Sequence, residues 1–95
     1  MYGTIFNLRI KPNHEEALLK VFNEDQSTPL GMVAWFIMKP DSTDIWIGVA
    51  VFESQEAYVA NSESPSQHQT FMALMDHLEA EPEWTDGIFV IGQIA

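Results

Sequence analysis

The sequence predicts an α+β fold in which a four-stranded antiparallel sheet carries two helices on one face. Three observations lead to this prediction. The expected elements follow one another as strand, helix, strand, strand, helix, strand, with no repeat and no internal linker. Both helical segments have an apolar stripe at helical spacing, and the two middle strands are apolar on both faces. With 95 residues, the chain is expected to form one domain over positions 1–95.

The first strand and the first helix are separated by a proline. The strand is predicted over residues 2–11, where alternate side chains are apolar and therefore point to one face. Asn13, with Glu16 three residues later, has the pattern of a capping box, so a helix is predicted over residues 14–25. Its apolar stripe consists of Ala17, Leu18, Val21 and Phe22.

The two middle strands are predicted over residues 31–39 ("GMVAWFIMK") and 44–53 ("DIWIGVAVFE"). A strand with one face in water should alternate apolar and polar residues, and neither of these does. The polar turn between them would place Trp35 opposite Gly48, where the indole could cover the missing side chain.

The second helical region contains two start signals. Ser54 is expected to cap a short helix, and Ser64 to restart one with Pro65 at its first position and Gln67 completing the box. A last strand is predicted over residues 88–94. The resulting βαββαβ order is that of a ferredoxin-like sandwich.

Two helices can cover only one face of four strands, yet the later strands are apolar on the other face as well. Leaving about six large side chains in water would forfeit roughly 1.5–3 kcal/mol each, whereas a whole domain is stable by about 5–15 kcal/mol. We therefore expect a homodimer formed through this open sheet face, although a different partner protein would satisfy the same physics.

Composition excludes several classes of partner. The formal net charge is −10, with 14 acidic residues against 4 Lys plus Arg, so nucleic acid and anionic membranes are not expected partners. The chain has no cysteine, which excludes disulfides, thiolate nucleophiles and Cys-based metal sites. Its apolar runs are too short to span a bilayer, and its start lacks the features of a secretory signal, so a soluble, cytoplasmic protein is expected.

The stretches "FNLRIKPNHEEALL", "GMVAWFIMKPD" and "WIGVAVFESQEAYVANSESPSQHQTF" resemble the antibiotic biosynthesis monooxygenase-like family of dimeric α+β barrels. The most specific part of the likeness is the passage from the third strand into the second helical region. The resemblance implies the fold and the dimer. It also implies an oxygenase activity, because family members include cofactor-free monooxygenases of aromatic polyketides and quinols. Other members degrade haem.

The chain departs from the family pattern at several positions. Asn61 and Ser66 stand where the family often has histidines. The haem-degrading members look to use an Asn on the first strand with a Trp and a His from the second helical region. Here Phe6, Asn61 and Phe71 align with those three positions, so haem degradation is disfavoured.

His68 is the candidate proton acceptor, with Asn61 beside it as a second candidate catalytic residue. His68 shares the apolar stripe of its helix, and it could equally be an ordinary half-buried histidine at a helix start. Candidate substrate-binding residues are polar groups and aromatic rings, although strand aromatics are more often plain core. They are Asn7, Tyr58, Trp35, Trp46, Phe71 and Trp84.

Metal and cofactor sites have no support in the sequence. His14 lies at a helix start, and His68 and His77 are nine residues apart, without the i, i+4 spacing of a helical zinc site. There is no dinucleotide or phosphate-loop motif. Two hypotheses remain. The first is a cofactor-independent monooxygenase of a small phenol, quinol or anthrone, which needs His68, Asn61 or Asn7 in an enclosed cavity. The second is a non-catalytic dimer that binds a small apolar ligand or serves as an interaction module.

Overall fold

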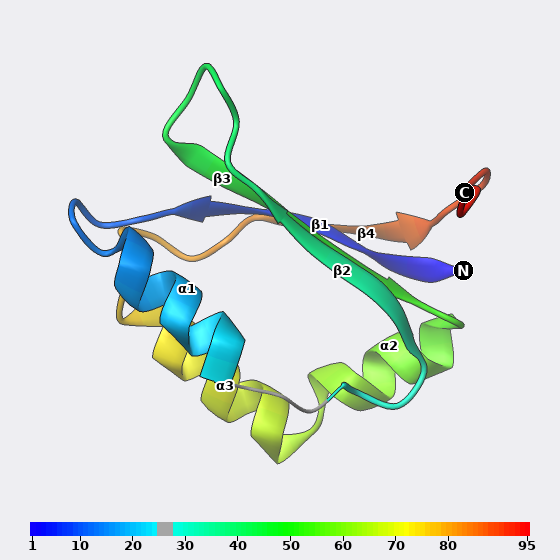
Figure 1. Ribbon diagram of the computed structural model, residues 1–95. Coiled ribbons are helices and arrows are strands. Elements are labelled where there is room, and N and C mark those ends of the chain that lie inside the picture. Colours follow the sequence, from blue (N-terminus) through cyan, green and yellow to red (C-terminus); the bar gives the residue numbers. More distant parts are fainter. Residues whose placement is uncertain (25–27) are drawn as a thin grey trace.

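The computed structural model describes residues 1–24 and 28–95, and its strands form one antiparallel sheet in the order β2-β3-β1-β4. The strands are β1 (Tyr2–Arg9), β2 (Met32–Met38), β3 (Ile45–Phe52) and β4 (Trp84–Ile88). The helices are α1 (Glu15–Glu24), α2 (Gln55–Ser62) and α3 (Pro65–Met75). All three helices lie on the same side of the sheet, and its other side is bare (Figure 1). This is the predicted α+β ferredoxin-like fold, with the second helical region divided in two.

Helices α2 and α3 begin at the predicted serines. The Ser54 hydroxyl accepts a hydrogen bond from the backbone N–H of Ala57, and the Ser64 hydroxyl accepts one from Gln67, both at 3.2 Å. Pro65 is the first residue of α3. These side-chain acceptors satisfy N–H groups that a helix start leaves without a partner. The two caps explain why two short helices form here instead of one long one.

The predicted cap of α1 is wrong. Asn13 has a φ of 67°, in the left-handed region, whereas an N-cap residue has extended backbone. It lies in a tight turn in which the N–H of His14 donates to the carbonyl of Lys11 at 3.0 Å, and the helix begins at Glu15. Asparagine tolerates this conformation better than most residues, which explains its presence in the turn. The predicted end of this helix, at position 25, lies outside the described residues.

The last strand was predicted too late in the chain. β4 covers Trp84–Ile88 and pairs antiparallel with β1, from Phe6 opposite Trp84 to Tyr2 opposite Ile88. Because β1 begins at Tyr2, residues after 89 have no neighbouring strand to pair with. The prediction of a strand over 88–94 was therefore wrong, since it followed the apolar pattern of the C-terminal segment and ignored the length of its partner.

The predicted pairing of Trp35 with Gly48 is also wrong. Trp35 lies opposite Ala50, because the two strands first pair at Met38 and Ile47, farther from the turn than the expected loop would place the first pair. Gly48 is covered instead from β1, because a Cβ added there would collide with the ring of Phe6. An aromatic ring does compensate for this glycine, but it comes from the other neighbouring strand.

The core lies between the sheet and the helices and consists largely of leucine. Around it pack partly buried side chains from β1, β2, α1 and α3. Leu8 of β1 and Leu18 of α1 are fully buried, so replacing either with alanine would remove about 2–5 kcal/mol of stability. The buried members of this cluster are Leu8, Leu18, Trp46, Leu74 and Leu78.

The open sheet face, on the side without helices, presents large apolar side chains to solvent. Ile5 of β1, Phe36 and Met38 of β2 and Ile47 of β3 are between 36% and 66% exposed. Their strand partners place them all on this face. β4 is less apolar here than expected, because the residues it contributes are Thr85 and Gly87. The apolar surface is therefore concentrated on the three strands β2, β3 and β1.

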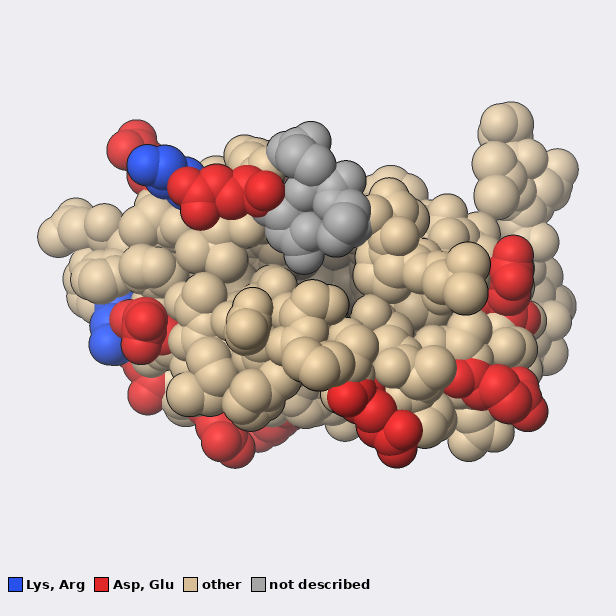
Figure 2. All heavy atoms as spheres, turned by 90° about the horizontal axis from the view of Figure 1, so that it is seen from below, with Lys and Arg blue, Asp and Glu red and all other residues tan. Residues whose placement is uncertain are grey.

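The helix-covered side carries scattered acidic groups and few basic ones (Figure 2). The four basic residues of the chain include Lys39, which pairs with Glu15 at 3.6 Å, and Lys11, whose ammonium donates to the carbonyl of Asp76 at 3.0 Å.

Within the described ranges, no helix has the length and apolar character needed to cross a membrane.

Candidate functional site

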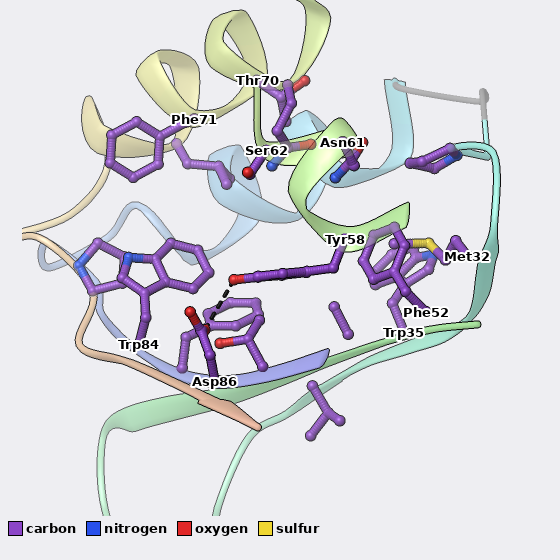
Figure 3. A pocket seen from close by; sticks show the side chains of 18 of the residues that line it. Met32, Trp35, Phe52, Tyr58, Asn61, Ser62, Thr70, Phe71, Trp84 and Asp86 are labelled. Carbon is purple, nitrogen blue, oxygen red and sulfur yellow. Dashed lines mark hydrogen bonds between the residues drawn. The ribbon is translucent and has the colours of Figure 1, made fainter. Parts of the chain in front are cut away.

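A cavity of about 490 Å³ lies between the sheet and the helices. This volume is within the range of small-molecule sites in proteins. Aromatic side chains from several elements form much of its wall: Trp84 from β4 and Phe71 from α3 lie at one end, and Trp35 from β2 lies at the other (Figure 3). The rings of Phe6 and Trp84 are 4.7 Å apart, and those of Phe71 and Trp84 are 6.4 Å apart. Flat rings on opposite walls favour a flat apolar ligand.

Tyr58 of α2 extends into the middle of the cavity (Figure 3). Its hydroxyl donates a hydrogen bond to Oδ1 of Asp86 on β4 at 2.9 Å. Its ring packs against Tyr2 and Phe52, with centroids 5.5 and 5.6 Å away. These contacts fix both ends of the side chain, so the phenol is a positioned polar group in the cavity.

The pKa of Tyr58 is raised to about 12, first by burial and then by the hydrogen bond to Asp86. In the unfolded chain the phenol ionises near its usual value of 10. Between these values only the unfolded state loses the proton, so this contribution to stability is complete below pH 10 and is lost as the pH rises towards 12.

We expect Asp86→Asn to lower the pKa of Tyr58, because it removes the negative charge while burial of the phenol remains. The chain has two tyrosines, so a Tyr2→Phe background leaves Tyr58 as the only tyrosinate signal. An ultraviolet pH titration in that background measures the pKa directly. A midpoint that does not change with Asp86→Asn would show that the carboxylate has no influence on Tyr58.

His68 and Asn61 both line the cavity, from α3 and α2. Asn61 is half-buried, whereas His68 is exposed, so the imidazole lies at the rim of the cavity and not in its interior. Gln67 lines the same wall. With the hydroxyls of Ser62 and Thr70, this side of the cavity therefore offers two amides, one imidazole and two hydroxyls, opposite the Asp86 carboxylate (Figure 3).

Of the eight candidate site residues, six line the cavity and two do not. Tyr58, Trp35, Phe71 and Trp84 are in the lining with His68 and Asn61. Asn7 is on the opposite side of the sheet, where its side-chain oxygen accepts a hydrogen bond from the N–H of Glu83 at 2.9 Å. Trp46 is in the core, 4% exposed. The structure does not bring either residue to the site.

Asp86 and Thr4 also line the cavity, although neither is among the candidate residues that the sequence predicts. The predicted last strand starts at position 88, two residues after Asp86, so the sequence pattern leaves Asp86 outside any strand. Thr4 and Asp86 are strand partners, opposite each other on β1 and β4. One sequence pattern could have predicted their position. Trp84 and Asp86 alternate on one face of β4, as their partners Phe6 and Thr4 do on β1.

His14 and His77 lie together, away from the cavity. Their Nδ1 atoms are 3.0 Å apart, which joins the start of α1 to the segment after α3. Across the residues that the structure describes, there is no cluster of three or more His, Cys, Asp or Glu side chains that could hold a metal ion. The histidine pair is best explained as a contact between two elements.

The fold and the cavity place the chain among ferredoxin-like α+β proteins with a pocket between sheet and helices. SnoaB, a cofactor-independent oxygenase from Streptomyces nogalater, superimposes with a TM-score of 0.81 at 14% identity, covering 96% of this chain and 94% of its own. A Nitrosomonas europaea protein, named provisionally as an antibiotic biosynthesis monooxygenase, gives 0.80 at 14% identity, covering 96% and 100%. A protein from Chloroflexus aurantiacus with the same provisional name gives 0.73 at 22%, covering 96% of each chain.

The chain thus has the fold of solved structures that are named antibiotic biosynthesis monooxygenases, over nearly its whole length. No protein-family model matches the sequence, and no curated protein matches it. At identities of 22% and below, the similarity establishes the fold.

Proposed function

We propose that the chain is a cofactor-independent monooxygenase that acts on a small phenol, quinol or anthrone bound between the sheet and the helices. The observation that carries this proposal is the cavity itself, which combines a flat aromatic wall with Tyr58, Asn61 and His68. The fold of SnoaB supports it, because that protein is named as a cofactor-independent oxygenase.

In this mechanism the substrate supplies the electrons and the protein supplies the environment. His68 takes a proton from the substrate, Asn61 holds a substrate oxygen by a hydrogen bond, and the aromatic walls exclude water. The electron-rich anion then passes electrons to dioxygen. For oxidation of a ring CH₂ group to a carbonyl, one oxygen atom enters the product and the other leaves as water. The substrate supplies all four electrons, so no cofactor is required.

We also propose that the working unit is a homodimer formed through the open sheet face. Four large apolar side chains on this face are at least 36% exposed in a single chain. Beyond β4, the C-terminal segment adds Val90, Ile91 and Ile94, each more than 80% exposed. A second copy would cover these surfaces with a matching apolar surface, which is the usual arrangement in a two-fold dimer.

Dioxygen uptake tests the proposed activity. An oxygen electrode records the dioxygen consumed when the protein is mixed with each of a panel of hydroquinones and anthrone at neutral pH. A chelator is present and no cofactor is added. A blank without protein is subtracted, because such compounds oxidise slowly by themselves. We expect uptake above the blank, and one labelled oxygen atom in the product from ¹⁸O₂. Uptake equal to the blank across the panel would rule out the oxygenase.

The second candidate is a non-catalytic dimer that binds a small apolar ligand. The exposure of His68 favours it, because a proton acceptor at the rim of a cavity is less protected from water than one inside. Binding of the aromatic panel without dioxygen uptake would identify this function.

A further inference from the structure

At the polar end of the cavity, two hydroxyl groups already donate their protons in hydrogen bonds within the protein. Tyr58 donates its proton to Asp86 at 2.9 Å, and Thr4, which is 2% exposed, donates to the backbone carbonyl of Thr85 at 3.3 Å. A hydroxyl group has one proton to donate and two lone pairs that accept. Tyr58, Thr4 and Asp86 therefore offer a ligand only hydrogen-bond acceptors.

This end of the cavity also has a negative charge with no counter-ion. Among the lining residues, all of which belong to the described part of the chain, Asp86 is the acidic residue and none is lysine or arginine. Lys39 and Lys11 are engaged elsewhere, with Glu15 and with the backbone of Asp76. Asp86 is exposed, so water weakens the repulsion that an anionic ligand meets there, but no lysine or arginine of the lining offsets it.

The opposite wall differs in character. Asn61 and Gln67 are amides, which can donate to a carbonyl of the ligand as well as accept from it. A ligand that spans the cavity would therefore meet acceptors at the sheet and amides at the helices. This arrangement fits a molecule with an O–H or N–H group at one end and a carbonyl or ring at the other.

We propose that the cavity selects uncharged aromatic ligands that donate a hydrogen bond to Tyr58 and Asp86, and rejects anionic aromatic ligands of the same shape. This inference rests on the proposed function only in taking the same cavity as the binding site, and it does not require catalysis. It restricts the oxygenase substrate to compounds that enter in their neutral form.

Three naphthalenes of similar size test this selectivity by calorimetric titration at pH 7. 2-Naphthol is neutral and has a donor, 2-methoxynaphthalene is neutral without a donor, and 2-naphthoate is an anion. We expect 2-naphthol to bind at least about tenfold more tightly than either of the others. 2-Methoxynaphthalene cannot donate the hydrogen bond, and 2-naphthoate is repelled by the carboxylate. Equal affinities for 2-naphthol and 2-naphthoate, or no binding of 2-naphthol at millimolar concentration, would overturn the proposal.

Two variants locate the cause of the selectivity. Asp86→Asn should reduce the preference for 2-naphthol over 2-naphthoate by about tenfold, because it removes the charge and adds a donor. Glu79→Gln removes the same charge outside the cavity lining and should leave the preference unchanged. A preference that is the same in Asp86→Asn as in the natural chain would exclude Asp86 as its cause. The naphthalene comparison in the natural chain does not depend on either variant being folded.

The outcomes separate this inference from the proposed function. Selective binding of 2-naphthol with no dioxygen uptake from any hydroquinone would remove the oxygenase and keep the ligand selectivity. Dioxygen uptake together with equal binding of 2-naphthol and 2-naphthoate would keep the oxygenase and remove the ligand selectivity.

Discussion

Replacing His68 with alanine is expected to lower the rate of dioxygen uptake by about 10²–10⁴-fold, the usual contribution of a positioned general base. The imidazole lies at the rim of the cavity, within reach of a ligand that fills it. Because the side chain is exposed and its backbone N–H bonds to Ser64, its loss removes no core packing. We therefore expect an intact dimer with unchanged ligand affinity and a much slower reaction.

Gln69→Ala is the matched control, because Gln69 is exposed on the same helix and does not line the cavity. It should keep the full rate. Unchanged turnover in His68→Ala would remove the imidazole from the mechanism and leave bulk water as the proton acceptor.

Ile47→Glu is expected to convert the proposed homodimer into a monomer. Ile47 lies on the open face of β3, opposite Asn7 of β1 and Met38 of β2. In a two-fold dimer the substitution would bury one unpaired carboxylate from each copy, at a cost of several kcal/mol for each charge. The dissociation constant should therefore rise by about 10³-fold or more, since each 1.4 kcal/mol is a factor of ten.

Leu19→Glu is the control for this prediction. Leu19 is 41% exposed on α1, close to the 36% of Ile47, but it lies on the helix side of the molecule. Analytical ultracentrifugation at micromolar concentration should show a dimer for the natural chain and for Leu19→Glu, and a monomer for Ile47→Glu. A natural chain that sediments as a monomer would contradict the proposed dimer itself.

Local sequence patterns were sufficient to predict the framework of the fold. The apolar runs around Trp35 and Gly48 became β2 and β3 to within one residue at each end, and Ser54 and Ser64 start their helices as expected. These features depend on contacts within a few residues, because a cap satisfies the N–H groups of its own first turn and a strand needs a continuous apolar segment.

Apart from the cap at Asn13, where a local tight turn takes the place of the predicted cap, the errors involve partners that are distant in the chain. The position of β4 depends on where β1 begins, and the cover over Gly48 depends on which neighbouring strand carries a ring. The side of the sheet on which Asn7 lies separates it from the cavity, although its residue type suited the site. A one-residue change in register reverses the face of every side chain, so such errors move residues into or out of a site.

The sequence by itself determined the order of the elements, the doubly apolar strands and the acidic surface, because each of these follows from composition and local periodicity. Only the tertiary structure decided that Asp86 of β4 meets Tyr58 of α2 and that Trp46 belongs to the core. The physical reason is that a cavity is defined by side chains from separate elements, and their meeting depends on strand register and helix packing over the whole chain.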